Sequence, residues 1–109
     1  MSKVMVIACY RPKQDKDDEL LAQVKTHLPI LRAEGLVDDS PSLCGRAKDG
    51  TIVEVFCWKS ESAVASAHEN PAVEKMWQAF GEVCEYTSIG KVDGAHDLFT
   101  PLEPIDLDV

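Results

Sequence analysis

Residues 42–58 read SLCGRAKDGTIVEVFCW, two strand-like runs separated by Asp49-Gly50. Asp-Gly is typical of tight two-residue hairpin turns, so this stretch predicts two antiparallel strands joined by a type I′ turn. With Asp49 and Gly50 as the turn, Lys48 faces Thr51, and the other opposed pairs of the two strands follow from that one. The hairpin is the strongest local signal in the chain.

The predicted register places one carboxylate among apolar side chains. On one face, small Gly45 and Ala47 lie beside large Phe56 and Trp58, which leaves a dip in the sheet with Glu54 in it. A half-buried carboxylate costs free energy unless it is paired, so Glu54 should bind a ligand, His68 or an arginine. Alternatively, Glu54 lies on the opposite, dimer-facing side in a salt bridge. The arginines considered for that bridge are Arg11, Arg32 and Arg46.

Capping residues in the flanking segments predict where helices begin and end. An acidic cluster precedes an amphipathic helix that should kink or restart at Pro29 and stop at Gly35. Ser60 is a good N-cap for a short helix, and Asn70-Pro71 restarts the helical pattern. The expected elements are a strand over 3–10, a helix from about 15 to 35, strands over 42–48 and 51–58, helical pieces after 60 and after 70, and a last strand over 85–92.

The order strand, helix, strand, strand, helix, strand predicts an α+β fold, a ferredoxin-like βαββαβ sheet with both helices on one face. Residues 1–100 would form this domain, and residues 101–109 would be an extended acidic tail. One face of the sheet would be left uncovered. We therefore expect a homodimer with two-fold symmetry that buries this face.

Composition narrows the classes of partner. The chain has 109 residues, of which 45% are hydrophobic, and a formal net charge of −8. The length and apolar fraction suit one compact domain. The negative charge disfavours nucleic acid and anionic membrane surfaces as partners. No apolar run approaches the roughly 20 residues that span a bilayer. The four cysteines contain no C-x-x-C pair and the apolar N-terminal run is too short for a secretory signal, so we expect free thiols, no metal site and a cytoplasmic protein.

The run from Val53 to Ser60, VEVFCWKS, is followed by Ala67-His68 and Pro71. These residues resemble the antibiotic biosynthesis monooxygenase (ABM) family, small proteins of the dimeric α+β barrel superfamily. Its members typically show an aromatic residue on the third strand, then Ser-x-x-Ala, then Ala-His before a second helical stretch. The resemblance, which extends to about Phe99, implies a ligand pocket in each subunit between sheet and helices. It also implies oxygenation of phenolic compounds without flavin, haem or metal.

Haem degradation, another activity of that superfamily, is disfavoured. In the haem-degrading members an iron-binding histidine lies on the second helix, and the matching position here is Trp77. Their characteristic asparagine on the first strand is also missing from residues 6–9, which read VIAC. We therefore expect no cofactor.

The candidate catalytic residues are His68, which matches the Ala-His of the family, and Glu54. His68, helped by Glu54, would polarise or deprotonate the substrate, although a histidine near a helix end is often only a capping or surface residue. Aromatic and apolar residues expected to line the pocket occur at a spacing that is more often that of plain core. The expected substrate-binding residues are Tyr10, Phe56, Trp58, Met76, Trp77, Phe80 and Tyr86.

Two functions of different classes follow. The first is a cofactor-independent monooxygenase-like enzyme that acts on a small aromatic or quinone-type compound. The second is a non-catalytic dimeric module that binds a hydrophobic metabolite. A cavity that touches both His68 and Glu54 would favour the enzyme, whereas a tightly filled core with His68 facing solvent would favour the module.

Overall fold

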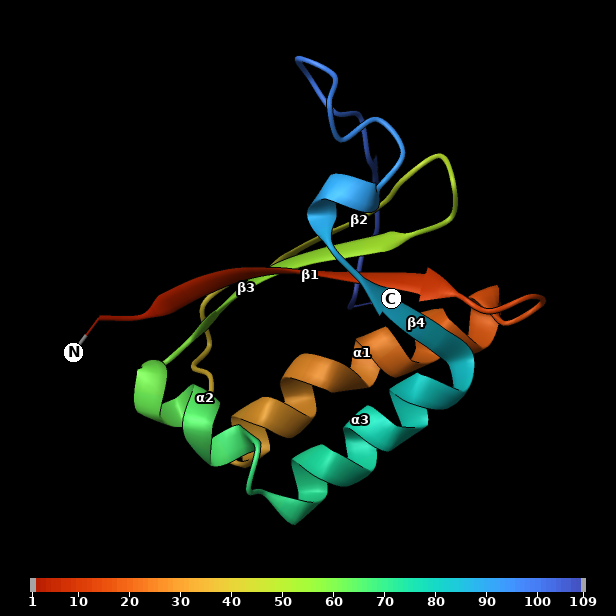
Figure 1. Cartoon of the computed structure of the whole chain (residues 1–109). Coiled ribbons are helices and arrows are strands. Elements are labelled where there is room, and N and C mark those ends of the chain that lie inside the picture. The colour runs from red at the N-terminus through yellow and green to blue at the C-terminus, as the bar shows by residue number, and fades with distance from the viewer. Residues whose placement is uncertain (1, 109) are drawn as a thin grey trace.

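The computed structural model describes residues 2–108, which form an α+β fold of one five-stranded sheet and three α-helices. The strand order is β4-β1-β3-β2-β5, and each neighbouring pair is antiparallel. The helices all lie under one face of the sheet (Figure 1). In chain order the elements are β1 (Val4–Pro12), α1 (Asp17–Ala33), β2 (Leu43–Arg46), β3 (Ile52–Trp58), α2 (Glu61–Ala67), α3 (Pro71–Val83), β4 (Cys84–Thr87), the short 3-10 helix η1 (Ile89–Lys91) and β5 (Glu103–Pro104).

The predicted residues at the helix boundaries are confirmed: Ser60 and Asn70 cap the starts of α2 and α3, and Gly35 follows the end of α1. Ser60 Oγ accepts the amide of Ala63 at 3.1 Å, and Asn70 Oδ1 accepts the first amides of α3. Gly35 ends α1 with a φ of +74°, a conformation that glycine adopts without steric cost. The helix does not restart at Pro29, because α1 continues through it. Pro29 is exposed, so water can replace the bond that its missing amide would have made.

The core lies between the helices and the side of the sheet that faces them. Each large apolar side chain that is fully buried contributes about 1.5–3 kcal/mol, so this layer supplies most of the stability. Among residues 2–108 no helix is long and apolar enough to cross a membrane. The most deeply buried apolar side chains of this layer are Leu20, Val24, Leu31, Ile52, Val73 and Phe80.

The β2–β3 hairpin is confirmed, but its predicted register is wrong by one residue. The Ala47 amide donates to the Thr51 carbonyl at 2.8 Å, so the turn holds three residues and not two. Gly50, with a φ of +88°, supplies the left-handed residue that closes such a turn. A one-residue slip moves each side chain of β2 to the other face. Gly45 therefore lies on the face away from the helices, and the predicted dip beside Glu54 does not form there.

Strand β4 is shorter than predicted. It ends at Thr87 and not near residue 92, because the chain turns into η1. Strand β4 pairs only with Cys9–Pro12 of β1. Within residues 2–108, the edge of β1 from Val4 to Ala8 therefore has no strand beside it.

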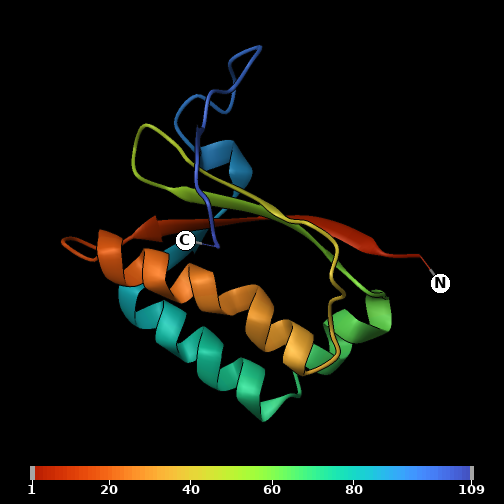
Figure 2. The ribbon, with the colours of Figure 1, turned by 180° about the vertical axis from the view of Figure 1, so that it is seen from behind.

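Part of the segment 101–109 joins the sheet as β5. Glu103 and Pro104 pair with Arg46 and Gly45 of β2, so this segment forms the outer edge of the sheet. The amide of Ile105 then donates to the Cys44 carbonyl at 2.9 Å. Figure 2 shows this segment returning from the tip of the molecule across the sheet towards α1.

The face of the sheet away from the helices is covered at one end only. There Val92 packs against Cys9 and Val53. Elsewhere on this face Ile7 is 53% exposed and Leu43 74% exposed. The segment after β4 rises from the same side (Figure 1). The fold thus leaves an uncovered apolar area on its sheet, as expected from the order of elements.

Candidate functional site

A hollow of about 400 Å³, widely open to solvent, lies between the sheet and the three helices. We call it the aromatic cavity because rings from both layers form most of its wall. Alternate side chains of a strand point to the same face, so Val6, Ala8 and Tyr10 of β1 face the cavity. Ile7 borders the cavity at the unpaired edge of β1, although its side chain lies on the other face of the sheet. The lining residues are Val6, Ile7, Ala8, Tyr10, His27, Phe56, Trp58, His68, Trp77 and Tyr86.

A second hollow, of about 440 Å³, lies between α1 and residues 105–108. Beside apolar side chains, charged side chains of both signs line it, including Arg32, Asp39 and Asp106, and they make its surface mainly polar. Apolar ligand sites usually combine hydrophobic walls with a few polar groups, a description that fits the aromatic cavity and not this hollow. The aromatic cavity also holds most of the residues expected at a site.

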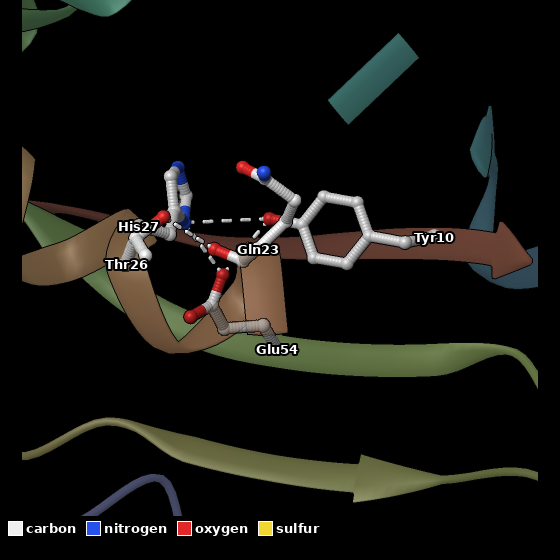
Figure 3. A network of polar contacts seen from close by, with 5 residues as sticks. All are labelled: Tyr10, Gln23, Thr26, His27 and Glu54. Atoms are coloured by element: carbon white, nitrogen blue, oxygen red, sulfur yellow. Dashed lines mark hydrogen bonds and ion pairs between the residues drawn. The ribbon is translucent and has the colours of Figure 1, made fainter. Parts of the chain in front are cut away.

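Tyr10, His27 and Glu54 form a hydrogen-bonded cluster at the wall of the aromatic cavity (Figure 3). Glu54 Oε1 accepts the Tyr10 hydroxyl at 2.8 Å and lies 2.7 Å from His27 Nδ1. The side chain of Glu54 is fully buried, and His27 is only 4% exposed. Tyr10 and His27 line the cavity, whereas Glu54 lies outside its wall. We call these three residues the buried triad.

The hydrogen-bond pattern assigns the protons of the triad. The Tyr10 hydroxyl donates a hydrogen bond to Glu54 Oε1, so the short contact to the same oxygen places a proton on His27 Nδ1. A neutral imidazole protonated at Nδ1 has an unprotonated Nε2 on the far side of its ring. Among residues 2–108, Nε2 has no hydrogen-bond partner. The ring borders the cavity, and Nε2 is the nitrogen that Glu54 leaves free.

Glu54 is the acidic residue of the triad. Its Oε2 atom is buried and has no hydrogen-bond partner among the described residues. Burial, and then the nearby Glu54, raise the pKa of Tyr10 far above the ordinary tyrosine value, so its hydroxyl stays protonated. The same two causes raise the pKa of Cys44, which pairs with Glu54 across the strands, to about 12. The Tyr10 hydroxyl and the Cys44 thiol are therefore neutral.

Aromatic contacts hold the imidazole of His27 in place. Phe56 and Phe80 pack against it nearly at right angles, with ring centroids at 5.2 and 5.5 Å. Elsewhere on the wall, His68 ends α2 and packs against Trp77 with centroids 5.2 Å apart. The two histidines thus differ in setting, since His27 is buried and His68 is exposed.

Most of the residues predicted to contact a ligand line the aromatic cavity. Phe80 and Met76 do not, because both are buried in the core between α3 and the sheet. For these two positions the alternative assignment to plain core describes the structure. The predicted residues that do line the cavity are Tyr10, Phe56, Trp58, His68, Trp77 and Tyr86.

Glu54 lies on the helix side of the sheet, paired with a residue that the sequence did not single out. Within residues 2–108, no hydrogen bond joins Glu54 to His68 or to an arginine. Its partner His27 lies three residues after Val24 and four before Leu31, on the buried stripe of α1. A histidine on a buried helical stripe needs a polar partner, so its position in the sequence could have indicated that His27 belongs to a buried polar cluster.

Residues 2–108 contain no group of three or more His, Cys, Asp and Glu side chains that could hold a metal ion. No model of a known protein family matches the chain, and no curated protein or solved structure matches it either. The chemistry of the aromatic cavity and the buried triad is therefore the basis for a function.

Proposed function

We propose that the protein is a cofactor-independent monooxygenase-like enzyme that acts on a small aromatic or quinone-type compound held in the aromatic cavity. The observation that carries this proposal is a cavity of about 400 Å³ with aromatic walls and the imidazole of a buried His–Glu pair. Ligand cavities are usually about 300–1,000 Å³, mostly apolar, with a few placed polar groups. Offset and edge contacts with Phe56, Trp58 and Trp77 suit a planar ring.

The substrate supplies the electrons in the proposed reaction. After an acidic hydroxyl or an activated CH₂ group loses a proton, the resulting anion reacts with O₂. The CH₂ group becomes a carbonyl, one oxygen atom enters the product and the other leaves as water. The protein has to bind the compound, accept a proton and restrict the access of water. Two imidazoles on the cavity wall, those of His27 and His68, can accept that proton.

A non-catalytic module that binds a hydrophobic metabolite is the second candidate. Two observations favour it: His68 is exposed, and Glu54 lies outside the cavity wall. The pairing of Glu54 with His27 favours the enzyme, because apolar binding alone does not require a buried charge, which is expensive to maintain.

Oxygen uptake by purified, chelator-treated protein tests the proposal. With an anthrone as substrate we expect one O₂ consumed per molecule oxidised, and one atom of ¹⁸O₂ in the carbonyl product. The variant Trp77→Ala should raise the KM, because it removes a wall of the cavity, and the exposed His96→Ala serves as control. Equal rates for wild type and His68→Ala would remove His68 from the mechanism. Binding without turnover across a panel of anthrones and hydroquinones would overturn the enzyme in favour of the module.

We further propose that the sheet is ferredoxin-like and that the chain is a member of the ABM family. The strand order β4-β1-β3-β2, with helices on one face and a cavity between the layers, supports this assignment. The run from Val53 to Ser60 lies on β3 and its exit to α2, where the resemblance places it. In this fold family the uncovered sheet face would be buried in a dimeric α+β barrel.

The partner that we propose is a second copy of the chain, packed on the uncovered sheet face. Met5, Ile7 and Leu43 are 70%, 53% and 74% exposed on this face, an apolar area that a monomer would leave in water. Light scattering should give a particle of twice 12.0 kDa, and Ile7→Lys combined with Leu43→Lys should reduce it to 12.0 kDa. The control Glu69→Lys, outside this face, should leave the dimer intact. A wild-type particle of 12.0 kDa would contradict the dimer.

A further inference from the structure

We infer that His27, and not His68, takes the proton from the hydroxyl of a bound phenol, and that Glu54 and Tyr10 hold it in position to do so. This inference rests on the proposed function, since it assumes an aromatic ligand with an acidic hydroxyl in the cavity. It assigns the chemistry to a residue of α1 that the sequence motifs did not include. The step is simple: the O–H bond of the phenol breaks, an N–H bond forms at His27 Nε2, and the electron pair stays on the phenolate oxygen.

The geometry of His27 is that of an oriented base. Its Nδ1 is held 2.7 Å from Glu54 Oε1, and its ring is fixed between Phe56 and Phe80. Nε2 therefore points away from the carboxylate, and the ring itself is part of the cavity wall. A base whose second nitrogen is bound to a carboxylate has one tautomer and one orientation, which is what proton abstraction at a fixed position needs.

The charge of Glu54 explains why the transfer is favoured at this place. Glu54 is fully buried, and its Oε2 atom has no hydrogen-bond partner among residues 2–108. An uncompensated carboxylate in such a position is expensive. When His27 gains a proton at Nε2, the neutral ring becomes an imidazolium that directly contacts this carboxylate. Proton uptake thus gives the buried carboxylate, which already accepts hydrogen bonds from Tyr10 and His27, a positively charged partner.

Tyr10 acts as a positioning residue. Its hydroxyl donates to the same Glu54 oxygen at 2.8 Å and lies 3.4 Å from His27 Nδ1. Its raised pKa, caused mainly by burial, keeps the hydroxyl a donor, so Tyr10 does not compete with His27 for the proton. The hydroxyl therefore fixes the carboxylate oxygen in front of Nδ1.

His68 lacks these features. It is exposed at the end of α2, it contacts the ring of Trp77, and within residues 2–108 no carboxylate is bonded to it. A charge on its imidazole would be stabilised by water and not by a fixed partner. Its position suits a wall of the cavity that contacts the ligand ring.

Ionisation of bound 4-nitrophenol, measured without oxygen, tests the inference. The phenol and its phenolate absorb at different wavelengths, so the ratio of the two in the bound state can be followed against pH. In the wild type we expect the bound probe to be ionised at a lower pH than the free probe. His27→Gln should lower the ratio of bound phenolate to phenol by about tenfold or more, equivalent to one pKa unit of the probe. The affinity for 4-nitroanisole, which has no acidic proton, should change little.

Two further variants serve as comparisons. His68→Gln should weaken binding of 4-nitrophenol and 4-nitroanisole alike, while the bound phenolate fraction stays the same. The exposed His96→Gln should change neither quantity. If His68→Gln abolishes the ionisation, or if His27→Gln retains it, the inference is wrong.

A readout in the wild type covers the case that His27→Gln does not fold. Nitrogen-15 NMR should show His27 protonated at Nδ1 only in the free protein, and at both nitrogens when 4-nitrophenolate is bound. A ring that stays singly protonated in the complex would overturn the inference. Failure of the proposed function would give a different result: the wild-type protein would still ionise bound 4-nitrophenol but would consume no oxygen with any substrate. Oxygen uptake with unchanged ionisation in His27→Gln would refute the inference alone, and absence of probe binding would refute both.

Discussion

Tyr10 and Glu54 are diagonal neighbours on β1 and β3, and the Tyr10 hydroxyl reaches across the strands to donate to Glu54 Oε1 at 2.8 Å. The residue directly opposite Glu54 is Ala8. Ala8 has a small side chain, and His27 of α1 contacts the carboxylate on this face of the sheet. The sheet therefore positions the triad by pairing small Ala8 with Glu54 and placing the side chain of Tyr10 two residues after Ala8 on β1.

Removal of the Glu54 carboxylate should destabilise the protein strongly. Glu54→Ala leaves the Tyr10 hydroxyl and His27 Nδ1 buried without an acceptor, so we expect a loss of about 3–5 kcal/mol in the free energy of unfolding. Glu54→Gln retains one acceptor oxygen and should lose less. Urea denaturation measures both. The exposed Glu69→Ala should change stability by less than about 0.5 kcal/mol. Full stability of Glu54→Ala would show that the triad contributes nothing to folding.

Phe80 and Trp77 should respond differently to truncation, although both are aromatic residues of α3. Phe80 is fully buried, so Phe80→Ala should cost about 3–5 kcal/mol by leaving a void in the core. Trp77 borders a space that already exists, and Trp77→Ala should cost about 1–2 kcal/mol while enlarging the cavity. Thermal or urea unfolding compares the two. Equal losses would mean that the space beside Trp77 is filled by side chains in solution.

Gly45 should not tolerate a side chain. A Cβ atom there would lie 2.9 Å from Leu102 Cβ and 3.3 Å from the Glu103 carbonyl, so Gly45→Ala must displace β5. We expect a loss of about 1–3 kcal/mol and faster hydrogen exchange of the Ile105 amide, which donates to β2. The matched control is Gly81→Ala, on an exposed face of α3 with nothing within 4 Å.

Gly81→Ala should stabilise the protein by about 0.5–1 kcal/mol, because alanine is the better helix former. The contrast between the two variants separates a local clash from a general effect of substituting glycine. Unchanged exchange of Ile105 in Gly45→Ala would mean that β5 is not held against β2.

Alkaline pH should weaken the fold through buried thiols. Burial raises the pKa of Cys44 from 9.0 to about 12, and that of Cys84 to about 11. The folded protein therefore favours the neutral thiols more than the unfolded chain does. This contribution to stability is complete below the thiol pKa of the unfolded chain and is lost as pH rises from about 9 towards the folded values.

Urea midpoints measured between pH 7 and pH 11 test this dependence. We expect the midpoint to fall above about pH 9, and to fall less steeply in Cys44→Ala, which lacks one of the titrating groups. A midpoint with the same pH dependence in wild type and Cys44→Ala would contradict the effect of Cys44.

The sequence predicts elements better than it predicts their register. Ser60, Asn70 and Gly35 mark helix ends through local hydrogen bonds and backbone angles, which neighbouring residues determine. The hairpin was recognised from Asp49-Gly50, but the same dipeptide fits turns of two and three residues. Which of the two forms depends on the faces that the strands bury, and that is decided by the whole sheet.

The candidate site was predicted in part for a similar reason. The aromatic residues of β3 and α3 reach the cavity because their local periodicity already defines a buried face. His27 was missed because its partners, Tyr10 and Glu54, lie on two different strands. A lone histidine on a helical stripe indicates that a polar partner exists, but only the tertiary fold identifies it.

A crystal structure with a phenol that does not react with oxygen tests the central claim most directly. We predict the ring between Phe56, Trp58 and Trp77, with its hydroxyl oxygen about 2.7–3.0 Å from His27 Nε2. A phenol bound elsewhere, or a cavity closed by the side chains of Trp77 and His68, would contradict the claim.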